Sequence, residues 1–163
     1  MEQKINEAAV WDRVSAAARS AEPDRGRTGR DTGPIGPDLL EAMGRERTAA
    51  QEHRQLAGRA GAEGQRVLRR IAVQEEQHSR TLGALYYFLT GQLPQTQTVQ
   101  VSARQEGFRE GLRRSLQSRE LTAGRYEALA ARTTGEVRQA LIQLAQEEAQ
   151  HFHMLLGLLK GCL

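Results

Sequence analysis

Apolar side chains recur every three or four residues along four stretches of this chain, which is the spacing of one face of an α-helix. The pattern predicts helices over about residues 38–60, 63–90, 102–133 and 135–160. The first should begin at Asp38, since Pro37 precedes it and Asp38 and Glu41 have the spacing of a capping box. Gly91 is a natural stop for the second. We therefore expect an all-α fold.

The connection between the second and third helices sets the expected topology. Residues 91–101 (GQLPQTQTVQV) have no helical pattern and contain a proline. Eleven extended residues can span about 36 Å, roughly the length of a helix of 20–25 residues. This segment can therefore run from one end of a bundle to the other. The expected fold is an antiparallel four-helix bundle with one long crossover between helices two and three.

The N-terminal part has a different composition. Residues 1–21 have the pattern of a short amphipathic helix, whereas residues 22–37 are rich in glycine, proline and arginine and offer almost nothing to bury. We expect two parts, a short helix with a flexible linker over residues 1–37 and the helical bundle over residues 38–163.

The chain also contains an internal repeat. A shift of 73 residues places Leu68 on Leu141, and it aligns the motif Glu75-x-x-His78 with Glu148-x-x-His151. Two helical hairpins built on one plan predict a bundle with pseudo-twofold symmetry.

The repeated motif places polar residues on apolar stripes. Glu75 and His78 lie on the inner face of the second helix, and Glu148 and His151 lie on that of the fourth. A carboxylate in a core costs several kcal/mol unless it is paired or bound to a cation. Glutamate oxygens and neutral imidazoles suit iron, manganese or zinc. The spacing therefore indicates a metal site.

A dinuclear carboxylate site needs one more carboxylate from each remaining helix. Glu46 lies on the stripe of the first helix. The 73-residue shift maps Glu46 onto Arg119, and the neighbouring Glu120 lies roughly 80–100° from the centre of the apolar face. A π-bulge would turn Glu120 inward, so we expect it to be the sixth ligand. We expect His53, Tyr126 and Arg119 to lie beside the ligands.

The complete pattern, Glu46…Glu75-x-x-His78…Glu120…Glu148-x-x-His151, resembles the ferritin-like superfamily, in particular rubrerythrin-type di-iron carboxylate domains, over about residues 38–160. The resemblance implies two iron ions bridged by Glu75 and Glu148, with Glu46 and Glu120 as terminal ligands and one histidine on each ion. It also implies oxidation of iron(II) by peroxide or dioxygen, in oxidative-stress defence or iron handling. We expect a homodimer, with residues 86–88 as packing or dimer surface.

Several residues depart from the family pattern. The single cysteine, Cys162, excludes a rubredoxin module, so a peroxidase would need an external electron donor. Alanine stands at position 123, where rubrerythrins have a second glutamate, and Arg119 would be a poor neighbour for two cations. Two alternatives therefore stay open. One is an iron-storage or encapsulated-cargo protein, and the other is a metal-free helical interaction module in which Arg119 pairs with the carboxylates.

Charge changes this picture only slightly. The chain has 23 Lys and Arg against 20 Asp and Glu, a net charge of +3, and only two lysines, so nucleic acid is not an expected partner. No apolar run reaches the roughly 18 residues of a membrane span, which favours a cytoplasmic protein without a membrane partner. If four acids are internal, the excess of positive charge on the surface of the bundle is larger than the net charge suggests.

Overall fold

The computed structural model describes residues 34–95, 101 and 106–161. Its elements are α2 (Gly36–Ala57), α3 (Ala62–Thr90), α4 (Phe108–Ala131) and α5 (Gly135–Gly161). The described residues contain no strand, so the all-helical fold and the helical bundle are confirmed. The helix expected within residues 1–21, most of the linker and Cys162 lie outside the described residues.

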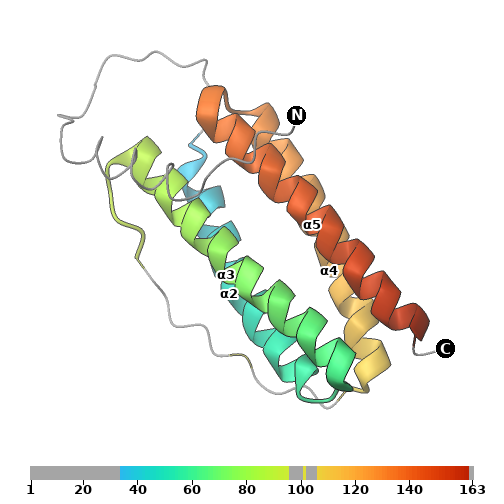
Figure 1. Cartoon of the computed structure of the whole chain (residues 1–163). Coiled ribbons are helices and arrows are strands. Elements are labelled where there is room, and N and C mark those ends of the chain that lie inside the picture. Colours follow the sequence, from blue (N-terminus) through green and yellow to red (C-terminus); the bar gives the residue numbers. More distant parts are fainter. Residues whose placement is uncertain (1–33, 96–100, 102–105, 162–163) are drawn as a thin grey trace.

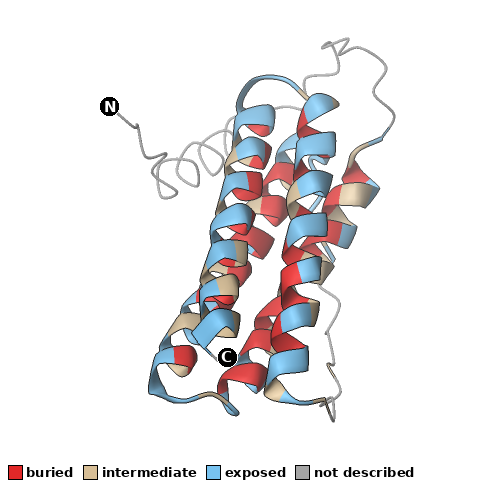
Figure 2. Ribbon diagram, turned by 90° about the vertical axis from the view of Figure 1, so that its right-hand side faces the viewer, coloured by how far each residue is buried: buried red, intermediate tan, exposed pale blue. Residues whose placement is uncertain are grey.

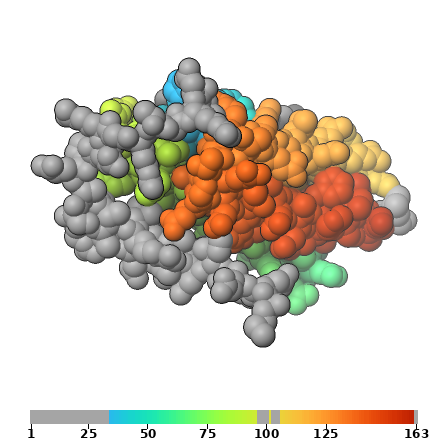
Figure 3. Space-filling model, turned by 90° about the horizontal axis from the view of Figure 1, so that it is seen from above, coloured from blue at the N-terminus to red at the C-terminus, as the bar shows by residue number. Residues whose placement is uncertain are grey.

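The helices pack as two pairs. Residues 58–61 join α2 to α3, residues 132–134 join α4 to α5, and the two members of each pair lie side by side along their lengths (Figure 1). The pairs meet where α3 contacts α5 and where α2 contacts α4. Figure 2 shows the buried faces turned inward, and the view from above in Figure 3 shows the atoms of α4 and α5 grouped together.

The start of α2 differs from the prediction. The helix begins at Gly36, with Pro37 in its first turn, and Ile35 is its N-cap without a side-chain hydrogen bond. The expected capping box at Asp38 is therefore wrong. The Asp38 carboxylate instead accepts a hydrogen bond of 2.6 Å from Arg132, in the turn between α4 and α5. An ion pair between α2 and the turn after α4 thus takes the place of a contact within one helix.

Gly91 ends α3, as predicted. Its φ of 68° is in the left-handed region, which glycine enters without a Cβ clash, and its N–H donates to the Tyr87 carbonyl at 2.8 Å.

The start of α4 is six residues later than predicted. Glu106 and Gly107 are not helical, and Gly107 is an extended N-cap for Phe108. The carboxylate of Glu106 forms an ion pair with Arg114 of α4. The backbone carbonyl of Glu106 accepts a hydrogen bond of 2.7 Å from Arg59, which follows α2. These two contacts hold Glu106 between α4 and the end of α2. The spacing of apolar residues in the sequence could not predict these contacts between distant parts of the chain.

The apolar core consists of two clusters. One gathers around Leu39, Leu82 and Leu141, and the other gathers around Leu68, Leu112 and Leu155. Apart from Ser115, which lies between Leu112 and Leu116 of the second cluster, the buried polar side chains come from the stretches of helix between these clusters. The core therefore encloses a polar layer between two apolar ones. No helix among the described residues is both long and apolar enough to cross a membrane.

Candidate metal centre

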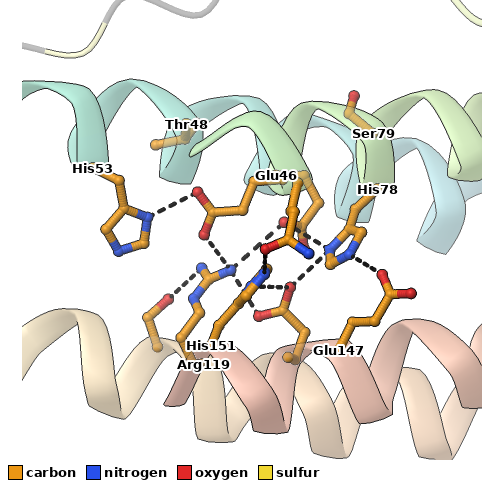
Figure 4. Close-up of polar contacts among 12 residues, drawn as sticks. Glu46, Thr48, His53, His78, Ser79, Arg119, Glu147 and His151 are labelled. Atoms are coloured by element: carbon orange, nitrogen blue, oxygen red, sulfur yellow. Dashed lines mark hydrogen bonds and ion pairs between the residues drawn. The ribbon is translucent and has the colours of Figure 1, made fainter. Parts of the chain in front are cut away.

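All four helices contribute ionisable side chains to one buried cluster. Glu46 comes from α2, Arg119 comes from α4, and each exposes 3% or less of its surface. The two motifs on α3 and α5 supply the rest, namely Glu75, His78, Glu148 and His151. In Figure 4, side chains from the upper and lower helices point toward one another. The structure thus brings together five of the six expected ligands.

Arg119 lies among the three carboxylates. Its Nη1 donates to Glu148 Oε2 at 2.9 Å, lies 2.9 Å from Glu75 Oε1 without hydrogen-bond alignment, and lies 3.6 Å from Glu46 Oε2. Burial by itself would lower the pKa of Arg119, but the surrounding carboxylates, Glu148 first, raise it above its ordinary value. Arg119 is therefore a permanent cation at the centre of the cluster.

Glu120 does not join the cluster, so the ligand set expected from the sequence needs a correction. α4 is a regular α-helix from Phe108 to Ala131, without the π-bulge that would have turned Glu120 inward. Successive residues on such a helix are about 100° apart. Arg119 takes the inward position, and Glu120 is exposed.

The two motif histidines are held by residues of the opposite helix. His78 Nε2 lies 2.7 Å from Glu147 Oε2, and His151 Nε2 lies 3.3 Å from Gln74 Oε1. The 73-residue shift relates Gln74 to Glu147, so both contacts obey the pseudo-twofold symmetry. The histidine rings stack with their centroids 5.3 Å apart.

Sequence reasoning missed Glu147 and Gln74. Both lie just before an inner glutamate, where the stripe predicts solvent exposure, yet each reaches across to the other hairpin. Glu76, just after Glu75, is partly exposed and pairs with Arg54 at 2.6 Å. The internal repeat could have indicated these two residues, because the 73-residue shift aligns Gln74 with Glu147.

His53 and Tyr126 orient two carboxylates, and the repeat also relates these two residues. His53 Nδ1 lies 2.8 Å from Glu75 Oε2, and the Tyr126 hydroxyl donates to Glu46 Oε1. Burial, followed by the nearby Glu46 carboxylate, raises the pKa of Tyr126 well above its usual value. The phenol therefore keeps its proton and remains a donor.

Protons distribute unequally among the remaining groups. Burial, and then the charge of Glu148, raises the pKa of Glu46 to about 8. Burial opposes the charged form of His78, but hydrogen bonds to Glu147 and Glu148 raise its pKa to about 10. Burial also opposes ionisation of Glu148, yet His151, His78 and Arg119 lower its pKa below the usual range. Without a metal ion, Glu46 is therefore protonated at neutral pH and His78 is an imidazolium.

Three of these side chains fit a metal ion. One ligand atom each from His78, Glu148 and His151 lies within 4.8 Å of the others. His78 Nδ1 is 2.9 Å from Glu148 Oε1, whereas His151 Nδ1 lies 3.6 Å from the same oxygen and has no hydrogen-bond partner among the described residues. Metal-binding histidines commonly donate their second N–H to an oxygen, as the Nε2 contacts allow here. A cation beside Glu148 would take the place of the proton between His78 Nδ1 and Glu148 Oε1, and it would also meet the unpaired Nδ1 of His151.

Comparisons with family models, curated proteins and solved structures find no match to this chain. The ferritin-like resemblance therefore rests on the spacing of the motif residues alone, and the function has to be argued from the geometry of the cluster.

Proposed function

We propose that this protein binds one divalent transition-metal ion through His78, Glu148 and His151, inside an antiparallel, ferritin-like bundle. The observation that carries the proposal is the buried Nδ1 of His151, which lacks a partner among the described residues and lies beside Glu148. An unpaired buried acceptor is costly, and a metal ion satisfies it. Two imidazoles and a carboxylate suit zinc, iron or manganese.

The charge of Arg119 favours one ion over two. When a metal ion displaces the protons of Glu46 and His78, the three inner carboxylates and Arg119 leave two negative charges in the cluster, which one divalent ion balances. Two ions bridged by Glu75 and Glu148 would require Arg119 to leave both carboxylates. The guanidinium thus stands in for the second cation of a di-iron centre.

The residues around the ligands support this role. Glu147 and Gln74 hold the Nε2 side of each imidazole, and His53 and Tyr126 hold the carboxylates of Glu75 and Glu46. Iron bound there would supply redox chemistry toward peroxide or dioxygen, as the resemblance implies. Under this proposal Tyr126 keeps its proton beside Glu46, and the two apolar clusters limit access of water to the layer.

The second candidate is a metal-free helical interaction module. It is favoured by the contacts of Arg119 with Glu75 and Glu148, because they form an ion network that needs no metal. Metal stoichiometry separates this candidate from the first.

The test is metal analysis of the full chain. Protein stripped with a chelator and reloaded without oxygen with iron(II), manganese(II) or zinc(II) should retain about one ion per chain of at least one of these metals. Two ions would instead support the di-iron centre, and no retained ion would support the metal-free module.

A pair of histidine variants tests the ligands. His151→Ala should abolish binding of the retained metal, because it removes one of three ligands. His153→Ala changes an exposed histidine two residues further along α5 and should leave binding unchanged. Equal retention by both variants would contradict the assigned site.

A further inference from the structure

A cavity of about 400 Å³ lies where α2, the last turns of α3 and the residues just after α3 meet. Its walls are largely apolar, with Leu40 and Met43 from α2, Tyr86 from α3, and Leu93 from the segment that follows. The volume of this cavity is within the ~300–1,000 Å³ that small-molecule sites usually have. The cavity is therefore large enough for a small organic ligand.

Residues 92–95 form one wall of the cavity because they fold back onto the helices. A Cβ added at Gly83 would lie 3.3 Å from Met43 Sδ and 3.4 Å from Pro94 Cγ, so Pro94 packs where α2 and α3 touch. Leu93, the residue before Pro94, lines the cavity and exposes 78% of its surface. This wall therefore offers apolar surface that the described residues leave uncovered.

Arg47 brings a positive charge to the cavity. Its Nε donates to Ser79 Oγ at 3.2 Å, and the Ser79 hydroxyl donates to the Met43 carbonyl at 3.2 Å. Ser79 is buried, and Figure 4 shows its hydroxyl pointing away from the ionisable cluster. A buried side chain of α3 thus fixes the guanidinium of Arg47 at the cavity and outside the metal centre.

The terminal nitrogens of Arg47 have no partner. Arg47 forms no ion pair in the part of the chain that the structure describes, and its hydrogen bond to Ser79 uses only Nε. Glu41, the acid that also lines this cavity, pairs with Arg45 of its own helix. Arg47 is half-buried beside apolar walls, where a charge without a partner is costly. An anionic group on a ligand would satisfy it.

The internal repeat shows that the packing of a hairpin does not require these residues. The 73-residue shift places Gly44 on Gln117 and Arg47 on Glu120, so α4 has a long side chain and an acid where α2 has glycine and arginine. Gly44 also lines the cavity, and a Cβ added there would meet no atom within 4 Å. The free space at Gly44 and the unpaired cation are therefore features of α2 alone.

We propose that this cavity binds a small molecule with a carboxylate head and a short apolar chain. The carboxylate lies on the terminal nitrogens of Arg47, because the planar guanidinium matches the two oxygens of a carboxylate. The chain lies against Met43 and Leu93, and covers the apolar wall that the described residues leave open.

The experiment uses octanoate as the probe. The full chain is titrated calorimetrically at low ionic strength, where charges are little screened, with octanoate, 1-octanol, acetate and inorganic phosphate. We expect saturable binding of octanoate. Binding should be at least about tenfold weaker for 1-octanol, which lacks the charge, and for acetate, which lacks the chain. Absence of octanoate binding, or equal binding of 1-octanol or acetate, would overturn the proposal, and tighter binding of phosphate would overturn the assignment to a carboxylate.

Variants of Arg47 test the contact with the carboxylate. Arg47→Ala should weaken octanoate binding at least about tenfold, the size expected for loss of a hydrogen bond to a charged group. Arg47→Glu introduces the residue found at the related position of α4, so it should abolish binding while keeping a cooperative unfolding transition. Arg54→Ala is the control, because Arg54 lies further along α2 and pairs with Glu76 at 2.6 Å. Equal binding by Arg47→Ala and Arg54→Ala would overturn the assigned site.

A glycine variant tests the cavity itself. Gly44→Leu should fill the free space and abolish octanoate binding, and it should still fold because leucine is a better helix former than glycine. Gly124→Leu is the matched control, since a Cβ added at Gly124 of α4 also meets no atom within 4 Å. Gly124→Leu should bind as the unaltered chain does. Unchanged binding in Gly44→Leu would show that the ligand lies elsewhere.

This proposal does not depend on the metal site. Octanoate binding should persist in His151→Ala, so a failure of the metal proposal leaves the cavity proposal standing. Loss of octanoate binding in His151→Ala, but not in Arg47→Ala, would place the carboxylate in the polar layer and overturn the cavity proposal.

Discussion

At the centre of the bundle, Arg119 holds the position in α4 that Glu46 holds in α2, and the two side chains face each other at 3.6 Å. This reversal of charge breaks the symmetry of the site, whose halves also differ at His53 and Tyr126 and at Gln74 and Glu147. A guanidinium is part of the protein chain and is always charged, whereas a metal ion can dissociate. The cluster therefore keeps one cation whether or not a metal is bound.

Removal of that cation should be costly. We expect Arg119→Ala to lower the free energy of unfolding of the metal-free protein by about 3–5 kcal/mol, because it leaves buried carboxylates without their partner. Chemical denaturation measures this change. The exposed Arg113→Ala should stay within about 0.5 kcal/mol of the unaltered protein.

A different substitution at the same position should change metal binding. Arg119→Glu would make α4 match α2 at this position, and we expect about two ions per chain in place of one. Metal analysis under the loading conditions above measures the ratio. A ratio that stays at one would show that Arg119 does not set the stoichiometry.

At the scale of the element, the helix ends depend on a few backbone positions. Gly91 has a φ of 68° at the end of α3, a conformation that costs other residues roughly 1–2 kcal/mol. Gly91→Ala should therefore lower the free energy of unfolding by about 1 kcal/mol, measured by denaturant titration.

Gly157 is the matched control for that change. It lies within α5 without a positive φ, and an added Cβ would meet nothing within 4 Å. Gly157→Ala should stabilise the protein by roughly 0.5–1 kcal/mol, since alanine is the better helix former. The two substitutions are chemically identical and are expected to have opposite signs. The same sign for both would contradict the role of the left-handed cap.

At the scale of the whole molecule, the buried layer links folding to protonation. The pKa of Glu46 is about 8 in the folded protein, raised first by burial, and that of His78 is about 10, raised by its hydrogen bonds to Glu147 and Glu148. Ordinary values are about 4.5 for this carboxyl and 6.5 for this imidazole. The folded state therefore holds protons that the unfolded chain has released.

These two raised pKa values make the folded protein less stable as the pH rises. Stability from the His78 proton is complete below about pH 6.5 and disappears as the pH rises through 10, and the contribution of Glu46 falls between about pH 4.5 and 8. The free energy of unfolding of the metal-free protein should thus decrease from pH 6.5 to 9, measured by denaturant titration. Glu46→Gln should make the decrease shallower, and a rise over this range would contradict the assigned proton positions.

The sequence by itself determined the helical bundle and most of the buried layer. Periodicity placed Glu46, Glu75, His78, Glu148 and His151 on inner faces, and all five are buried. This works because the direction of a side chain on a regular helix depends only on its position along that helix.

Tertiary structure decided the partners of those side chains. Whether Arg119 or Glu120 faced inward depended on whether α4 stayed regular, and only the packed bundle shows that Glu147 reaches His78 and that Asp38 pairs with Arg132. Such contacts join residues far apart in the chain, so the period of a single helix cannot predict them.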